Sequence, residues 1–369
     1  MTGLLPQLPT PPAGRRGWPW DRETPALPPT RSDGSSWPRI TVVTPSYQQA
    51  TFLEETLRSV LLQSYPALEY IVVDGGSTDG SREILERYGE WLDHWVSEPD
   101  SGQSEAINKG LARSTGEVWN WLNSDDLLEP GALAAVAEGF TPTGTRAVAG
   151  WERRFGEGHP TTLHQGTPRD HPLEWTLFVG HLDQPCTYFR RMDIEELGGL
   201  DTGLHWGMDL DLYMRYLLRF GQEDIRSVDS VISNFRLHAD SKTVRQEGGA
   251  RQEDQVARWS FRAEWGREVG VDPEILRAVE ATFPLRQVRP YRVEVELDST
   301  LMDFHFTSEL VSYFYFQRRD EEARHWLARL RANPFHRWDR RSLVLHARLH
   351  LLPAPMSRIL AGENPYLSP

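Results

Sequence analysis

Two adjacent carboxylates, Asp125 and Asp126, follow an apolar run in the stretch "WLNSDDLLEPGAL", residues 121–133. Neighbouring carboxylates repel each other, and a divalent cation makes such an arrangement favourable. With only oxygen ligands, Mg²⁺ or Mn²⁺ is the expected ion. Such an ion completes its shell with water and phosphate oxygens, so the pair predicts a phosphorylated ligand. The alternative is that both acids cap a helix that opens near Pro130.

Polar side chains also follow two other predicted strands. Thr44 and Ser46 end the first strand, Asp74 ends the second, and Asn123 precedes the two acids after the fourth. Because the carboxyl ends of parallel strands meet at one edge of a sheet, we expect these groups to share one crevice. Asp74 either reads a base or ribose there or is a turn residue before the glycines of "DGGSTDG".

An alternation of buried strands and amphipathic helices must position these groups. The stretch "ITVVTPSY" (40–47) and the stretch "EYIVVD" (69–74) indicate two parallel strands joined by a helix, for which Thr51 and Glu54 predict a capping box. Further strands are expected at 94–100 and 117–123, with a helix at 101–112 between them. This order predicts an α/β fold whose mostly parallel sheet carries helices on both faces.

The chain is expected to have three parts. Residues 1–37 are rich in proline and predict a tail that either packs on the body through Trp18 and Trp20 or is disordered. Residues 38–245 hold the α/β domain, and residues 246–369 are mainly helical in pattern.

Composition excludes several other classes of protein. A single cysteine, Cys186, excludes an intramolecular disulfide framework and a four-thiolate zinc site. A net charge of −13 argues against nucleic acid as a partner. No apolar run of eighteen residues occurs, and the N-terminus does not resemble a signal peptide, so we expect a cytoplasmic protein. The chain also lacks the GxGxxG and GxxxxGK[ST] motifs of dinucleotide and triphosphate sites.

Several ordered motifs together resemble glycosyltransferase family 2, which has the GT-A fold. They are "TVVTPSYQQATFLEETLRSVLLQSYP", "EYIVVDGGSTDGS", "VSEPDSGQSEAINKGLARSTGE", "WLNSDDL", "GLHWGMDLDLYMRYL" and "FRLHADSKT", spread over residues 38–245. The resemblance implies a nucleotide-diphosphate sugar as donor, a divalent metal, and inversion at the anomeric carbon. The implied acceptor is a carbohydrate or a lipid-linked molecule, within the synthesis of a surface polysaccharide or glycoconjugate.

The resemblance assigns roles to the strand ends. It places the nucleotide pocket at Thr44, Pro45, Ser46 and Tyr47, and it makes Asp74 the acid that reads the base. The DxD signature falls on Asn123, Ser124, Asp125 and Asp126, with Asp125 as main metal ligand and Asp126 as its support. Three positions depart from the family pattern: Asn123 replaces the first DxD acid, Gly75 stands where many members have Asp, and Ile107 where many have Arg. The identity of the base is therefore left open.

An inverting transfer needs a carboxylate that takes the proton of the acceptor hydroxyl. The stretch "GMDLDLYMR" offers Asp209 and Asp211. It resembles the family's "ED" helix start, with Met208 in place of Glu, which makes Asp209 the general base. The alternative is that Asp209 complements the helix dipole. Asp211 lies on another helix face, where we expect an acceptor contact or a structural one.

The stretch "FRLHADSKT" supplies further polar groups. By resemblance, His238 completes the metal shell or touches the diphosphate, and Arg236 and Lys242 pair with phosphate. A structural role for His238 is the alternative. Gln184, with Arg190 or Arg191, is expected to contact sugar or phosphate on the acceptor side; the alternative for their segment is a plain core strand.

Two other functions are alternatives to glycosyl transfer. A non-catalytic protein of the same fold would bind a sugar nucleotide or a partner, but the presence of Asp209 argues against it. A sugar nucleotidyltransferase needs a Gly-rich loop with Lys or Arg after the first strand, and "TPSYQQATFLEE" is not such a loop. The basic, aromatic region 321–350 either contacts an anionic membrane peripherally, contacts another subunit, or packs as a helical appendage.

Overall fold

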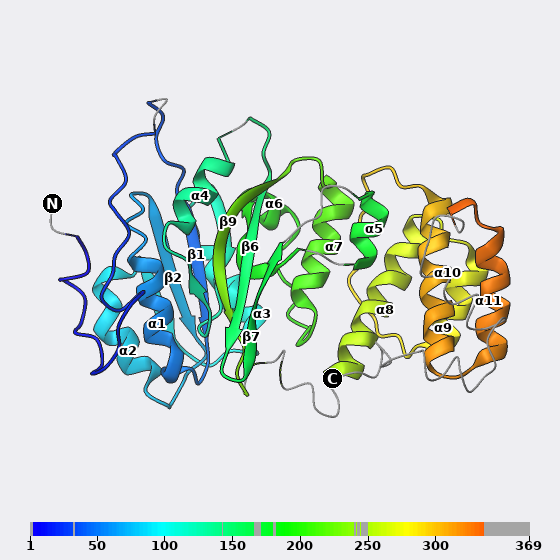
Figure 1. Ribbon diagram of the computed structural model, residues 1–369, viewed down its shortest axis with the longest axis horizontal. Helices are drawn as coiled ribbons and strands as arrows, with labels where there is room; N and C mark the ends of the chain where they lie inside the picture. Colours follow the sequence, from blue (N-terminus) through cyan, green and yellow to red (C-terminus); the bar gives the residue numbers. More distant parts are fainter. Residues whose placement is uncertain are drawn as a thin grey trace. The chain divides into compact units, whose positions relative to one another are not determined.

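The structure is a computed structural model that describes residues 3–31, 34–141, 143–165, 171–179, 182–239, 241, 244 and 250–335 (Figure 1). In chain order the elements are β1 (Ile40–Ser46), α1 (Ala50–Leu61), β2 (Leu68–Asp74), α2 (Ser81–Tyr88), η1 (Gly89–Trp91), β3 (His94–Ser97), α3 (Gln103–Arg113), β4 (Val118–Trp121), β5 (Leu127–Leu128), α4 (Ala132–Gly139), β6 (Ala147–Gly156), β7 (His159–Gln165), α5 (Leu173–Val179), η2 (Gln184–Cys186), β8 (Thr187–Arg190), α6 (Arg191–Glu196), α7 (Met208–Phe220), β9 (Ile225–Arg236), α8 (Ala250–Glu268), α9 (Pro273–Thr282), α10 (Ser299–Phe316) and α11 (Asp320–Ala332).

One sheet carries the candidate site. Its described strands run in the order β3-β2-β1-β4-β8-β6-β9-β5, with β7 paired to β6. The first four strands are parallel, as the sequence predicts. Beyond β4 the sheet is mixed, because β8 runs antiparallel to both β4 and β6. The predicted α/β fold of GT-A type is therefore confirmed, and its parallel part is the half built from β1 to β4.

Helices cover both faces of the parallel half. Ile40 and Val42 of β1 are fully buried in one core with residues of α1, α2 and α4. Side chains alternate along a strand, so Val43 points to the other face and meets α3. The approach is close there: a Cβ on Gly110 of α3 would lie 2.3 Å from Val43 Cγ1. The expected helices on both faces are present.

The predicted capping box at the start of α1 is wrong. Neither Thr51 nor Glu54 caps this helix, since α1 starts at Ala50 and has no side-chain cap from its own N-cap residue, Gln49. Instead Asp79, from the loop before α2, accepts a hydrogen bond from the Ala50 amide at 2.8 Å. A side chain 29 residues away thus caps the helix in place of the predicted local motif, and a local sequence pattern does not reveal such a partner.

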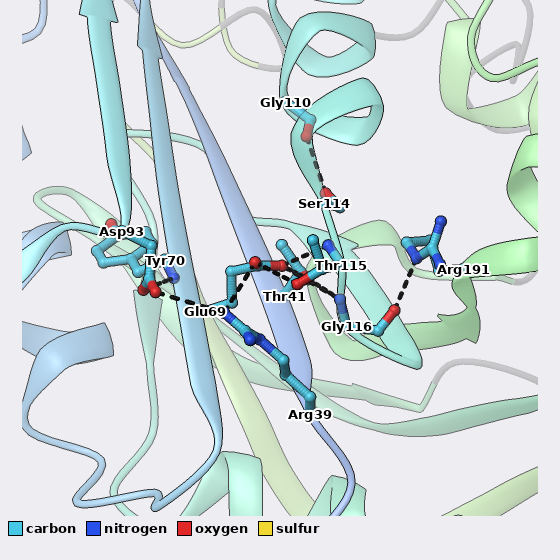
Figure 2. Close-up of polar contacts among 10 residues, drawn as sticks. All are labelled: Arg39, Thr41, Glu69, Tyr70, Asp93, Gly110, Ser114, Thr115, Gly116 and Arg191. Atoms are coloured by element: carbon cyan, nitrogen blue, oxygen red, sulfur yellow. Dashed lines mark hydrogen bonds and ion pairs between the residues drawn. The ribbon is translucent and has the colours of Figure 1, made fainter.

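A polar network ties the strands together at their amino-terminal edge (Figure 2). Glu69 of β2 is 4% exposed and accepts hydrogen bonds from Thr41 Oγ1 at 2.5 Å, Thr115 Oγ1 at 2.6 Å and the Thr115 amide at 2.7 Å. Arg39 pairs with the same carboxylate at 3.0 Å. The turn between α3 and β4 is thereby fastened to β1 and β2, at the edge opposite the candidate site.

The proline-rich N-terminal segment packs on α1. Arg58 is fully buried and donates hydrogen bonds to the carbonyl oxygens of Pro9, Pro19 and Trp20, at 3.0 to 3.1 Å. Trp18 Nε1 donates to the Leu128 carbonyl at 2.9 Å. Of the two alternatives for this segment, the structure shows the packed one for its described residues.

The chain divides into two compact units. The first holds the described residues up to 165 together with 182–216 and 221–244, and the second holds 171–179, 217–220 and 250–335. The second unit contains α5 and α8 to α11, and aromatic rings fill it: Phe178 lies 4.9 Å from Phe306 and 5.6 Å from Trp265 between ring centroids. The helical pattern expected after residue 246 is observed over its described part. Within that described part of the chain, no helix is long and apolar enough to cross a lipid bilayer.

Candidate active site

The ends of three parallel strands bring polar residues side by side. Register pairs Ser46 of β1 with Asp74 of β2, and Asp74 with Ser97 of β3. Tyr47, the next residue after β1, is 62% exposed, while Thr44 is fully buried with its hydroxyl 3.1 Å from Tyr70 Oη. Tyr47 is therefore open to solvent at the carboxyl edge, whereas Thr44 lies below it in the core, and the shared crevice stays a prediction.

Asp74 anchors the turn that follows its strand. It is fully buried and accepts four hydrogen bonds: from the amides of Gly76 at 3.2 Å and Ser77 at 2.8 Å, and from the hydroxyls of Ser77 and Ser97 at 2.6 Å each. A carboxylate has about four lone-pair sites. The contacts are thus those of the turn-residue alternative, and base reading by Asp74 stays a prediction.

The loop after β4 is held from below by α1. Thr56, buried in α1, donates its hydroxyl to the carbonyl oxygens of Ser124 at 2.9 Å and Asp126 at 2.8 Å. Asn123 accepts a hydrogen bond from Gln103 Nε2 at 2.8 Å and donates to Asp126 Oδ2 at 3.2 Å. Helix α4 starts at Ala132 after Gly131 without a side-chain cap, so the helix-cap alternative for the two acids is wrong.

Asp125 and His238 face each other across the end of the sheet. Asp125 Oδ2 lies 3.0 Å from His238 Nε2, and the two side chains are 17% and 14% exposed. The imidazole also packs on Phe52 of α1, with ring centroids 4.6 Å apart. Residues 113 positions apart in the chain therefore form one partly open pair of metal-ligand type.

Asp126 points the other way, into the protein. It is 1% exposed, its Oδ1 accepts the Arg236 amide at 2.8 Å, and its Oδ2 accepts Asn123 Nδ2. Burial raises the pKa of Asp126 well above its ordinary value, and the Asp125 carboxylate raises it further. The structure thus gives Asp126 the surroundings of a structural carboxyl group, and its role as a metal ligand stays a prediction.

Arg236 is engaged by the protein itself. Its Nε donates to the Asp125 carbonyl at 2.9 Å, its Nη2 pairs with Glu55 at 3.0 Å, and the guanidinium lies over Phe52 and Phe155. These contacts join β9 to α1 and to the Asp125 loop. Lys242, the other predicted phosphate partner, lies outside the described residues.

Helix α7 presents its acids in two different ways. Asp209 is half-buried in the first turn, and its Oδ1 accepts the Leu210 amide at 2.9 Å. Asp211 is fully buried and pairs with Arg215 at 2.7 Å. Of the two alternatives for Asp211, this contact is the structural one. Ser104 Oγ lies 2.9 Å from Met208 Sδ, so α7 starts beside the start of α3 at the carboxyl edge.

The residues predicted to lie on the acceptor side are found at opposite edges of the sheet. Gln184 is buried at the end of β4, where its Nε2 donates to the Trp121 carbonyl at 2.5 Å. Because β8 is antiparallel to β4, Arg190 pairs in register with Val118 at the opposite edge. There Arg191 Nε donates to the Gly116 carbonyl at 2.8 Å (Figure 2). The expectation that one of these two arginines contacts sugar or phosphate at the site is therefore wrong.

Sequence patterns missed a buried acid on β6. Glu152 is 2% exposed and its Oε1 lies 2.5 Å from Arg154 Nε, while Arg154 also lies 3.5 Å from Asp183. Burial and the nearby Asp183 raise the pKa of Glu152 to about 7, against the opposing effect of Arg154. The alternation of apolar and polar residues in "AVAGWERRFG" does not distinguish this inward acid from a solvent-facing one.

A parallel β3-β2-β1-β4 half with acidic residues at its carboxyl edge is an α/β arrangement of GT-A type. Residues 41–198 match the model of the family described as "Glycosyl transferase family 2". The resemblance to glycosyltransferase family 2 that the motifs indicate is therefore confirmed over these residues.

Named proteins resemble parts of the chain. TuaG of Bacillus subtilis, a glycosyltransferase named for teichuronic acid biosynthesis, is 43% identical over 97 residues, which are 25% of this chain and 38% of TuaG. An uncharacterized glycosyltransferase of Rickettsia typhi is 33% identical over 49% of this chain and 59% of its own length. The chain thus matches between about a third and three fifths of these relatives.

A solved structure supports the fold over most of the chain. Residues 1–349 of Staphylococcus aureus TarS, crystallised with UDP-GlcNAc, align with a TM-score of 0.54 at 17% identity, and the match covers 84% of this chain and 86% of that one. At this level of identity the likeness concerns the fold alone.

Proposed function

We propose that this protein is a divalent-metal-dependent, inverting glycosyltransferase that moves a sugar from a nucleotide-diphosphate sugar to an acceptor hydroxyl. The observation that carries the proposal is the Asp125–His238 pair, 3.0 Å apart and partly open, at the carboxyl edge of the parallel strands. Family membership of residues 41–198 supports it.

The donor set fits a Mn²⁺ or Mg²⁺ ion that shares its shell with a ligand. Among the described residues, no group of three or more His, Cys, Asp and Glu side chains could hold a metal. One carboxylate and one imidazole leave room for phosphate and water oxygens, which is how Mg²⁺ is commonly held beside a phosphorylated substrate. Asp125 and His238 would hold the ion, which when bound neutralises charge on the departing diphosphate.

The remaining chemistry belongs to side chains of the chain. Asp209 takes the acceptor proton while the acceptor oxygen bonds to the anomeric carbon and the bond to the diphosphate breaks on the opposite face, which inverts the configuration. The half-buried carboxylate at the start of α7 supports this role. Thr56 and Arg236 position the Asp125 loop through their contacts with its carbonyl oxygens.

The setting is proposed from relatives and charge. The name of TuaG supports a role in the synthesis of a polysaccharide or glycoconjugate. We place the protein in the cytoplasm, with its acceptor presented at the inner face of a membrane. Half of the basic stretch proposed to touch that membrane, residues 336–350 of 321–350, lies outside the described residues. Recovery of all the protein in the soluble fraction after flotation with anionic vesicles would contradict the membrane contact.

The first experiment is calorimetric titration of UDP, GDP and dTDP into the full chain, with Mn²⁺ and again with EDTA. We expect one nucleotide class to bind only with the metal, and Asp125→Ala to lose that binding. Glu90→Ala, which removes an exposed carboxylate in η1 ahead of β3, is the matched control and should bind as the wild type does. A folded wild type that binds none of them would favour the non-catalytic, partner-binding alternative.

A further inference from the structure

We infer that Asp100, in the loop between β3 and α3, is the residue that selects the base of the donor, and that it prefers a base with an imide N–H: uracil, thymine or guanine. The inference rests on the proposed function, since it concerns the nucleotide that the same site would bind. It starts from Gly75, which directly follows β2.

The space that a side chain at position 75 would fill is taken by the Asp100 carboxylate. A Cβ built on Gly75 would lie 2.9 Å from Asp100 Oδ2 and 3.2 Å from its Cγ. The loops after β2 and β3 touch at neighbouring points as well. A Cβ on Gly76 would lie 3.2 Å from the Pro99 amide nitrogen, and the Glu98 amide donates to the Asp74 carbonyl at 3.0 Å. The two glycines thus let the second loop lie on the first.

One oxygen of the Asp100 carboxylate accepts no hydrogen bond from a described residue, whereas both oxygens of Asp74 do. The Gly102 amide donates to Asp100 Oδ1 at 2.9 Å, and no described residue donates a hydrogen bond to Oδ2. The neighbouring Lys109 is committed to Glu98 and Glu105, both at 3.0 Å. Burial raises the pKa of Asp100, as expected of a half-buried carboxylate with few donors around it. Asp74, one residue before Gly75, is fully buried with its oxygens already used.

A carboxylate oxygen accepts hydrogen bonds and repels lone pairs. Uracil and thymine offer the N3–H group, and guanine offers N1–H beside its amino group. Adenine and cytosine place a ring-nitrogen lone pair at the equivalent position. With uracil, thymine or guanine the free Asp100 oxygen accepts a hydrogen bond from the ring N–H. With cytosine or adenine that oxygen is left without a donor, so Asp100 disfavours CDP and ADP.

The test compares UDP, GDP, CDP and ADP by calorimetry on the full chain with Mn²⁺, and pyrophosphate as a probe without a base. The wild type should bind UDP or GDP at least about tenfold more tightly than CDP and ADP. Asp100→Asn keeps an oxygen for Gly102 but turns the free acceptor into a donor. It should lose about ten- to a hundredfold in affinity for the preferred nucleotide and keep that for pyrophosphate within about twofold. Glu90→Gln is the matched control.

Moving the carboxylate from position 100 to position 75 by mutation gives a second, independent test. Asp100→Ala should lose the preference, and the double variant Gly75→Asp/Asp100→Ala should regain most of it, because the new side chain enters the vacated space. A wild type that prefers CDP or ADP, or an Asp100→Asn variant that binds all four nucleotides as the wild type does, overturns the inference and leaves the proposed function standing. A folded wild type that binds neither nucleotides nor pyrophosphate overturns the proposed function, and the inference with it.

Discussion

At the scale of single residues, adjacent acids receive opposite surroundings. Asp125 is partly open and faces His238, whereas Asp126 is buried and holds the Arg236 amide. The same contrast recurs in α7, where Asp209 is half-buried and Asp211 is sealed against Arg215. In both pairs one carboxylate is partly exposed, and its buried neighbour stabilises the loop or helix that carries both.

The first prediction separates Asp125 from Asp126. Asp126→Asn keeps an acceptor for the Arg236 amide and resembles the protonated acid that its raised pKa favours. We expect metal-dependent nucleotide binding to fall less than about tenfold in Asp126→Asn and to be lost in Asp125→Asn, because only Asp125 meets the ion. Titration with Mn²⁺ and the preferred nucleotide measures both. Equal loss in the two variants would instead make Asp126 the supporting metal ligand that the family signature implies.

The second prediction concerns the general base. Asp209→Asn should lower kcat about 10²- to 10⁴-fold and leave donor affinity unchanged, because the carboxylate acts on the acceptor proton during transfer. Release of nucleoside diphosphate, with water or an added sugar as acceptor, gives the rate.

The control for this prediction is Asp211→Asn in the same helix turn. It removes the buried pair with Arg215, so it should lower the melting temperature. The rate per folded molecule should stay close to that of the wild type. A wild-type rate in Asp209→Asn would mean that Asp209 is not the general base.

At the scale of elements, side chains that are distant in the sequence hydrogen-bond the polar groups left without partners at the ends of helices and strands. Asp79 caps α1 from the loop before α2, and Thr56 of α1 holds the loop after β4. Glu69 closes the amino-terminal edge by joining β1, β2 and the turn before β4 (Figure 2). The proposed catalytic groups lie at one edge of the sheet, and this hydrogen-bonded network joins the strands at the other.

The third prediction is a pH-dependent loss of stability in Glu69→Gln. Burial opposes ionisation of Glu69, but hydrogen bonds from Thr115 and Thr41 and the charge of Arg39 outweigh it and lower its pKa below the ordinary 4.5. A lowered folded pKa means that the stabilisation is complete above pH 4.5 and is lost as the pH falls through the folded value. The variant should therefore be less stable than wild type by about 1–3 kcal/mol at pH 7, and by less near pH 3.

Urea unfolding at the two pH values measures this difference. Glu86→Gln is the control, because Glu86 belongs to an exposed pair with Arg82 and should change the free energy of unfolding by less than about 0.5 kcal/mol. A Glu69→Gln effect that is equal at both pH values would mean that its charge contributes nothing.

At the scale of the whole molecule, the chain combines an acidic average charge with two compact units. The net charge of −13 does not favour nucleic acid as a partner. All the proposed metal and base ligands belong to the first unit, and the aromatic rings of the described helical bundle fill the second. The effect of ligand binding on stability should therefore be measured on the first unit.

The fourth prediction is a metal-linked gain in stability. The preferred nucleotide at about 100 times its Kd, with Mn²⁺, should stabilise the unit that binds it by about 2.7 kcal/mol, and EDTA should remove the gain. Thermal unfolding monitored with and without EDTA measures it, and Mn²⁺ alone is the reference. A nucleotide-dependent rise that survives EDTA or persists in Asp125→Ala would contradict a metal-bridged site.

The sequence by itself determined the alternation of strands and helices between residues 40 and 123, and the resemblance to the family. These features follow from local periodicity, from turn residues and from ordered motifs, which are all properties of neighbouring residues. The strand ends predicted Asp125 at this edge of the sheet, and the family resemblance added His238, which follows a strand of the same sheet.

Only the tertiary structure decided which of the predicted residues lie at the carboxyl edge and which of them are exposed there. The antiparallel direction of β8 took Arg190 and Arg191 to the far edge, and packing against α1 sealed Asp126 while leaving Asp125 open. The contact between the Asp100 carboxylate and Gly75 likewise joins two loops whose meeting no local pattern records. Burial and hydrogen bonding depend on partners that are remote in the chain, and the accessibility of each carboxylate is set by those partners.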